Sequence, residues 1–164
     1  MGSGKSSVGR MVAEDLSFDF VDTDRLIEGR AGMTITEMFA TRGEAAFREW
    51  ERQIVAELAG YQRTVIATGG GLPVFPGNLD NLKTHALVVC LWAGPETLYE
   101  RVAAHTHRPL LQGPDPRGCI RELLAAREPH YRAADVLVNT ENRSLREVAS
   151  HVTHHLLGAN GARP

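Results

Sequence analysis

The first residues of the chain, Met-Gly-Ser-Gly-Lys-Ser-Ser, combine the residue types that bind phosphate groups. They match the second half of the pattern G-x-x-x-x-G-K-[ST], in which backbone amides freed by glycine surround phosphate oxygens. Lys5 could place a positive charge on the outer phosphates, and the Ser6 hydroxyl could coordinate Mg²⁺. Val8, Val12 and Leu16 follow at helical spacing, which predicts a helix whose positive end adds to the site. The alternative is a glycine-rich terminus that binds nothing.

Two carboxylates lie one residue apart in Asp22-Thr23-Asp24, directly after an apolar run that ends at Val21. At the carboxyl end of a strand, one carboxylate could hold Mg²⁺ or its waters while the other faces a substrate hydroxyl. Asp and Thr also favour the first position of a helix. The tripeptide taken alone favours this capping interpretation.

Two further segments offer backbone amides and a cation. Thr68-Gly69-Gly70-Gly71 follows a predicted strand, and three glycines let a ligand approach the backbone closely, although they could equally form a flexible turn. Arg108-Pro109-Leu110-Leu111 is typical of a mobile segment whose arginine neutralises charge on a transferred phosphoryl group, or of an exposed loop. Considered singly, Arg48 and Arg132 are indistinguishable from surface arginines.

Composition places the chain among ordinary globular proteins. Its 164 residues, 43% hydrophobic and 23% charged, suit one domain over residues 1–164 with a substantial core. The net charge of −2 gives no reason to expect nucleic acid or a membrane surface as a partner, and no apolar stretch approaches the length of a membrane span. Two unrelated cysteines suggest neither a disulfide framework nor a zinc site, so we expect a cytoplasmic protein, and a monomer.

The elements that must position these residues alternate between strands and helices. Apolar runs predict strands at 18–22, 64–67, 87–92 and 135–138. Helical periodicity follows the first loop and recurs over 44–58 and 145–156, with capping boxes beginning at Thr34 and Ser144 and a helix start at Pro95. This alternation predicts an α/β fold with a doubly wound parallel sheet, whose sites lie at the carboxyl ends of its strands. Residues 114–116 are expected to form a loop, and the tail 158–164 to be disordered.

Taken in order, these motifs resemble the shikimate kinases, small members of the P-loop kinase superfamily. Many kinases share the sequence GSGKS, whereas its combination with five further motifs is much more specific. These motifs are Val21-Asp22-Thr23-Asp24, Phe47-Arg48, Thr68-Gly69-Gly70-Gly71, Arg108-Pro109-Leu110-Leu111 and Pro129-x-Tyr131-Arg132. The resemblance extends from Gly2 to about Leu156. It implies a three-layer α/β/α P-loop NTPase fold with a parallel sheet of order 2-3-1-4-5, and transfer of the γ-phosphate of ATP to the 3-hydroxyl of shikimate on the route to chorismate and the aromatic amino acids.

The resemblance also implies a role for each candidate residue, with ATP and Mg²⁺ as cofactors and shikimate as the substrate. Asp24 would take the proton of the reacting hydroxyl, and Lys5 and Arg108 would assist catalysis. The residues implied for ATP are Gly2, Ser3, Gly4, Lys5, Ser6, Ser7, Arg101, Arg108 and Arg143, and those implied for the metal are Ser6 and Asp22. The residues implied for shikimate are Asp24, Arg48, Gly69, Gly70, Gly71 and Arg132, whose arginines would bind its carboxylate. A segment at about 105–118 would form a lid over the site.

The chain departs from the family pattern at its start. The first glycine of the loop and the strand that precedes it in the family are not in the sequence. We expect a start codon assigned too late, with roughly ten or more residues before Met1, enough for one strand. Without that strand, the second and third strands of this chain are expected to face each other unpaired, and folding and activity of the chain are in question.

Two other functions fit part of the pattern. A gluconate-type kinase of the same superfamily would share the phosphate-binding loop, but the paired aspartates and the triple glycine favour shikimate. A kinase-derived binding module without catalysis is a rival from a different class, supported by the incomplete loop. Phosphorylation of gluconate would favour the first alternative, and an absence of ATP turnover would favour the second.

Overall fold

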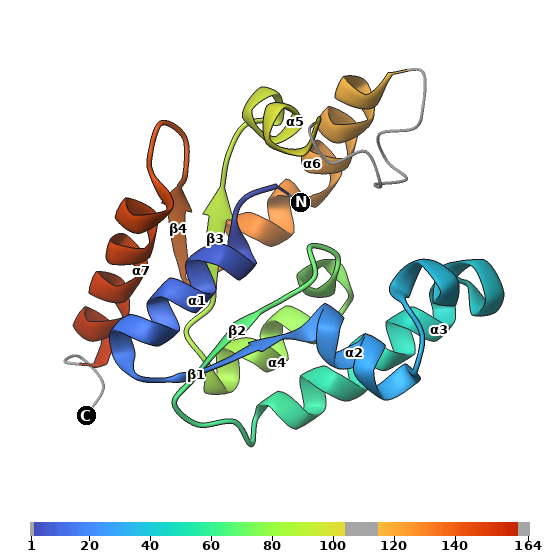
Figure 1. Ribbon diagram of the computed structural model, residues 1–164, viewed down its shortest axis with the longest axis horizontal. Helices are drawn as coiled ribbons and strands as arrows, with labels where there is room; N and C mark the ends of the chain where they lie inside the picture. The colour runs from blue at the N-terminus through green and yellow to red at the C-terminus, as the bar shows by residue number, and fades with distance from the viewer. Residues whose placement is uncertain (1, 104–114, 161–164) are drawn as a thin grey trace.

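The structure, a computed structural model, describes residues 2–103 and 115–160. Its helices and strands succeed one another as α1 (Lys5–Leu16), β1 (Asp19–Asp22), α2 (Thr23–Ala31), α3 (Ile35–Leu58), β2 (Thr64–Ala67), the 3₁₀ turn η1 (Leu72–Val74), α4 (Asn78–His85), β3 (Val89–Trp92), α5 (Pro95–Ala103), α6 (Pro116–Arg132), β4 (Val136–Asn139) and α7 (Leu145–Asn160) (Figure 1). The four strands predicted from sequence are confirmed, with ends that differ by at most two residues. Within the described residues, no helix combines the length and the apolar composition needed to cross a membrane.

The strands form two parallel pairs. Strand β1 pairs with β2, placing Asp22 opposite Ala67, and β3 pairs with β4, placing Trp92 opposite Asn139. No ladder joins β2 to β3 within residues 2–103 and 115–160, as the sequence predicts. These pairs are the outer pairs of the expected 2-3-1-4-5 order, and the parallel α/β class is confirmed. Asp22-Thr23-Asp24 and the triple glycine therefore leave the same edge of neighbouring strands.

Helices cover both faces of the strands, because alternate side chains of a strand point to opposite sides. Val65 of β2 packs against the cluster that contains Val8 and Val12 of α1 and Val148 of α7. Ile66, the next residue, packs against the cluster built from α2, α3 and α4. Helix α1 also reaches Val89 and Leu91 of β3 through the first cluster, so it lies across both strand pairs (Figure 1).

Helix α3 consists of two helical parts that meet at Gly43. The first part begins at Thr34, whose hydroxyl and backbone complete the predicted capping box with Glu37. Gly43 has φ 77° and ψ 174°, a conformation that a residue with a Cβ rarely adopts, and it breaks the helical path. Glu44 thus stands in the first turn of the second part, which carries Arg48. The helix predicted over 44–58 is this second part.

Two boundaries differ from the sequence predictions. Helix α7 continues to Asn160, so the expectation of a disordered tail is wrong for residues 158–160. Extending an existing helix by a turn costs little once its earlier turns are packed, as those of α7 are against α1. Helix α6 begins at Pro116, capped by Asp115, whose carboxylate accepts a hydrogen bond from the Gly118 amide at 2.9 Å. The last three residues of the expected lid are therefore helical, while Arg108 lies outside the described residues.

Candidate active site

The phosphate-binding motif leads directly into α1, as the sequence predicts. Gly2 and Gly4 have φ of 72° and 89°, and this left-handed conformation permits the tight turn that precedes the helix. Lys5 is the first residue of α1, and Ser6 and Ser7 lie in its first turn. The helix therefore directs its N-terminal amides and its positive dipole end toward the loop, an arrangement that attracts a phosphate group.

A cavity of about 410 Å³ adjoins this loop. It is lined by Gly2, Ser3, Gly4, Val8, Arg101, Thr140, Arg143, Ser144, Leu145 and Val148. Arg101 and Arg143, both implied for ATP by the family resemblance, thus line one cavity with the loop glycines. Arg101 is held in place because its guanidinium donates to the hydroxyl and the carbonyl oxygen of Thr140, at 2.8 and 2.7 Å. The size and position of this cavity suit a nucleotide.

Asp22 serves two purposes, one with each carboxylate oxygen. Its Oδ1 accepts hydrogen bonds from the amides of Asp24 and Arg25, so the capping interpretation is confirmed. Its Oδ2 accepts a hydrogen bond from the Ser6 hydroxyl at 2.7 Å. Adjacent oxygen ligands of an octahedral Mg²⁺ with ~2.1 Å bonds would lie about 3.0 Å apart. The pair of oxygen atoms therefore fits the magnesium site that the motifs imply.

Asp24 lies against the first residue of the triple glycine. A Cβ on Gly69 would stand 2.5 Å from Asp24 Oδ1, so any side chain at this position would displace the Asp24 carboxylate. The Gly69 amide also donates to the hydroxyl of Thr23, at 3.2 Å, and Thr23 is fully buried. Sequence reasoning missed this bond, although Thr23 stands between the two predicted carboxylates.

Arg48 reaches the same loop from α3. A Cβ on Gly71 would stand 2.7 Å from its Nη1. The Arg48 guanidinium donates to Glu51 Oε2 at 2.6 Å and, through Nε and Nη2, to Glu44 Oε1. Burial lowers the pKa of Arg48, but the hydrogen bonds to Glu51 and Glu44 outweigh it and the net shift is upward. Arg48 therefore remains a cation beside the glycine loop.

Glu51 is a buried carboxylate that the sequence analysis did not identify. Only 1% of its side chain is exposed, and this burial raises its pKa above the ordinary value of 4.5, although the hydrogen bond from Arg48 acts in the opposite direction. A signal was present in the sequence, because Glu51 follows Phe47 by four residues and precedes Val55 by four. It therefore falls on the apolar stripe of its helix, where an acidic residue needs a partner.

Arg132 approaches from the end of α6. Its neighbour Tyr131 donates a hydrogen bond to the carbonyl oxygen of Gly70 at 2.7 Å, which attaches the helix to the glycine loop. The Arg132 guanidinium lies 5.8 Å from the ring centroid of Trp92, the last residue of β3. Its Nε donates to Glu128 at 2.6 Å. Three consecutive glycines are thus in contact with Asp24, Tyr131 and Arg48, which come from three different helices.

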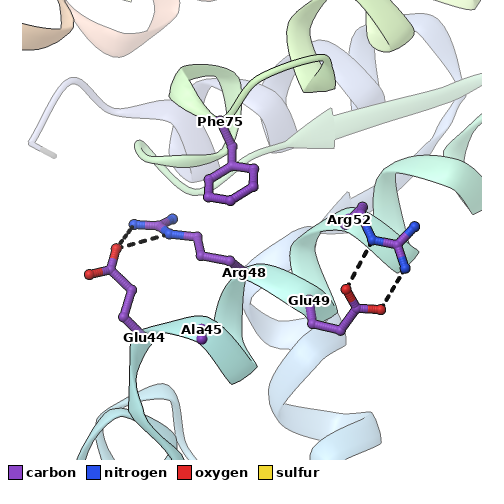
Figure 2. Close-up of a pocket in the computed structure, with 6 residues that line it drawn as sticks. All are labelled: Glu44, Ala45, Arg48, Glu49, Arg52 and Phe75. Atoms are coloured by element: carbon purple, nitrogen blue, oxygen red, sulfur yellow. Dashed lines mark hydrogen bonds and ion pairs between the residues drawn. The ribbon is translucent and has the colours of Figure 1, made fainter.

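A second cavity, of about 360 Å³, lies between α3 and Phe75, the residue that follows η1. Figure 2 shows its lining residues Glu44, Ala45, Arg48, Glu49, Arg52 and Phe75. It shares Arg48 with the site described above, but neither Asp24 nor the triple glycine is among its lining residues.

Comparison with known proteins agrees with the motifs and with this geometry. The family model for shikimate kinase matches residues 1–157. The chain belongs to the shikimate kinase family. Members of this family are kinases that use ATP and Mg²⁺, and the P-loop fold and the kinase activity predicted from sequence are confirmed.

Individual relatives support the same assignment. A shikimate kinase of Symbiobacterium thermophilum is 47% identical over 159 residues, which are 95% of this chain and 91% of that protein. The solved structure of a shikimate kinase from Acinetobacter baumannii in complex with shikimate superposes with a TM-score of 0.90 at 36% identity, over 97% of this chain and 89% of that one. A gluconokinase from Sinorhizobium meliloti superposes with a TM-score of 0.57 at 20% identity, over 97% of this chain and 92% of that one, and shares the fold alone.

Proposed function

We propose that the chain transfers the γ-phosphoryl group of ATP to the 3-hydroxyl of shikimate at the triple glycine. ATP occupies the cavity beside the loop at Gly2–Ser6, and shikimate lies against Gly69–Gly71. The observation that carries this proposal is the convergence of Asp24 and Arg48 on the same glycine wall. Shikimate carries hydroxyl groups and one carboxylate. The carboxylate of Asp24 can bind a hydroxyl, and the guanidinium of Arg48 can bind the carboxylate. The relative from Acinetobacter baumannii binds this same compound.

The described residues divide the reaction between them. Arg48 and Arg132 bind the carboxylate of shikimate through their planar guanidinium groups. Asp24 accepts the proton of the shikimate 3-hydroxyl while the oxygen of that hydroxyl forms a bond to the γ-phosphorus. The bond from that phosphorus to the β–γ bridging oxygen breaks, and ADP leaves. Lys5 and the amides at the start of α1 neutralise phosphate charge. Ser6 and Asp22 would hold Mg²⁺, which would supply further positive charge to the phosphate groups.

A coupled assay of ADP release tests this proposal. We expect release from MgATP that depends on shikimate and not on gluconate, measured with each compound at the same concentration. Dependence on gluconate would assign the site to a different acceptor. An absence of turnover by protein that still binds ATP would favour a binding module.

Asp24→Asn tests the assignment of the base. Asparagine keeps the shape of the side chain but cannot accept the proton, so we expect kcat to fall by about 10²–10⁴-fold while the shikimate KM changes little. Steady-state kinetics at saturating MgATP measures both quantities. An equal loss in affinity and in kcat would show that Asp24 only binds.

We also propose that the protein works in the cytoplasm as a monomer, with neither nucleic acid nor a membrane as partner. The net charge of −2 gives no reason to expect nucleic acid or a membrane surface as a partner. Sedimentation at micromolar concentration tests the oligomeric state, and a dimer that persists on dilution would contradict it.

A further inference from the structure

Each arginine proposed to bind the shikimate carboxylate has a glutamate one helical turn before it. Glu44 precedes Arg48 by four residues, and Glu128 precedes Arg132 by four. Both glutamates accept a hydrogen bond from the Nε of their arginine, at 3.0 Å for Glu44 and 2.6 Å for Glu128. The same arrangement thus occurs on two helices far apart in sequence, at the two residues that are to bind one group.

The contacts of Arg48 leave one edge of its guanidinium directed at the glycine loop. Glu44 Oε1 accepts from Nε and from Nη2, the latter at 2.6 Å (Figure 2), and Glu51 accepts from Nη1. A guanidinium has five N–H groups, so these three bonds leave one on each terminal nitrogen. A Cβ on Gly71 would lie 2.7 Å from Nη1 and 3.2 Å from Nη2, closer than the 3.4 Å to Cζ. The terminal edge therefore faces Gly71.

Arg132 is held in a comparable way. Glu128 binds its inner nitrogen, and the Trp92 ring lies against the guanidinium. The side chain of Arg132 is 64% exposed, so little packing fixes its orientation. Exposed ion pairs one turn apart contribute little to helix stability. Their shared geometry is better explained by what they do to the arginines.

We infer that Glu44 and Glu128 are positioning residues for shikimate, a role that rests on the proposed function of Arg48 and Arg132. Each glutamate holds the Nε side of its arginine and thereby presents the terminal N–H groups to the carboxylate of the substrate. Without it, Arg48 keeps its bond to Glu51 but its Nε side is no longer held, and Arg132 loses its bond from Nε to Glu128. Substrate binding must then order a less constrained guanidinium. Loss of either glutamate should therefore raise the KM for shikimate and leave kcat largely unchanged.

Glu44→Ala is the first test. We expect the shikimate KM to rise about 2–10-fold, while kcat and the KM for ATP stay within about twofold. Glu44→Gln keeps an oxygen that accepts from Nε, and we expect it to restore the KM. Glu49→Ala is the matched control, because Glu49 lies on the same helix and pairs with Arg52 at 2.6 Å and not with Arg48 (Figure 2). It removes the same charge and should leave the KM unchanged.

Glu128→Ala tests the second arginine in the same way, with Glu128→Gln as the rescue. Glu122→Ala is its control, because Glu122 lies exposed on the same helix. A double variant shows whether the effect passes through the arginine. We expect Glu44→Ala to add nothing to the shikimate KM once Arg48 is already alanine.

The outcomes separate this inference from the proposed function. An Arg48→Ala variant with an unchanged shikimate KM would overturn the assignment of Arg48 itself. A raised KM in Arg48→Ala together with equal KM values for Glu44→Ala and Glu49→Ala would overturn only the positioning role. A lowered KM in Glu44→Ala would show that the glutamate competes with the substrate carboxylate, which also contradicts the inference.

Discussion

At the scale of single residues, missing side chains matter as much as those present. The segment Gly69–Gly71 presents only backbone. The carboxylate of Asp24 lies close to where a Cβ of residue 69 would stand, and the guanidinium of Arg48 lies close to where a Cβ of residue 71 would stand. Any other residue at Gly69 or Gly71 would have to displace Asp24 or Arg48. Gly69 and Gly71 therefore leave free the space that the side chains of Asp24 and Arg48 occupy.

Gly71→Ala tests whether that space is needed. The added methyl group would lie 2.7 Å from Arg48 Nη1, and Arg48 is tied to Glu44 and Glu51, so the guanidinium must leave its position. We expect the shikimate KM to rise at least about tenfold, the equivalent of ~1.4 kcal/mol, with the KM for ATP unchanged. Gly29→Ala on α2 is the control, because nothing lies within 4 Å of its Cβ position. Equal kinetics for the two variants would show that Arg48 yields freely.

At the scale of elements, two hydrogen bonds attach the end of α6 to neighbouring segments. Tyr131 bonds the Gly70 carbonyl, and the Lys83 ammonium of α4 donates to the carbonyl oxygen of Ala133 at 2.8 Å. The end of α6 is therefore fixed to the chain on both sides of Arg132. This geometry explains how a largely exposed arginine can act at a defined place.

Tyr131→Phe removes one of these attachments and keeps the ring. We expect the free energy of unfolding to fall by about 1 kcal/mol, and the shikimate KM to rise by about 2–5-fold because Arg132 is less well placed. Chemical denaturation and steady-state kinetics measure the two effects. Tyr99→Phe on α5 serves as the control. A loss of stability with no change in KM would show that the bond is purely structural.

At the scale of the whole molecule, the site places a carboxylate inside the fold at a cost to stability. Glu51 has a raised pKa because burial disfavours its charge, and the nearby Asp24 adds to this effect while Arg48 and Arg127 oppose it. A raised pKa means that the folded state binds the proton more tightly than the unfolded state. Stability contributed by this proton is therefore present below pH 4.5 and is lost as the pH rises through the folded pKa.

Glu51→Gln should remove this dependence. Between pH 4.5 and 7.5 we expect the wild type to lose stability relative to the variant, by at most ~1.4 kcal/mol per pH unit. Thermal unfolding of both proteins across this range measures the difference. If the wild type instead gained stability relative to the variant as the pH rose, the bond to Arg48 would outweigh burial.

Periodicity and local chemistry predicted most of the elements. The four strands, the capping box at Thr34 and the cap at Asp22 depend on neighbouring residues, and local signals carry them well. The motifs likewise predicted that Ser6 and Asp22, or Asp24 and Gly69, belong to one site. The predicted disorder of the tail began too early, at residue 158, whereas α7 continues to Asn160. Position near a chain end does not show whether the preceding helix is fixed by packing.

The amino-acid sequence by itself determined the class of chemistry through the ordered combination of its motifs and the family that this combination resembles, because each motif taken singly also fits a purely structural role. Only the tertiary structure decided which edge of Arg48 faces the site, that Glu51 is buried beside it and that Tyr131 fixes α6 to Gly70. The physical reason is that hydrogen bonds and burial depend on distances between segments. Those distances are set by the packing of helices on strands, and no local pattern contains them.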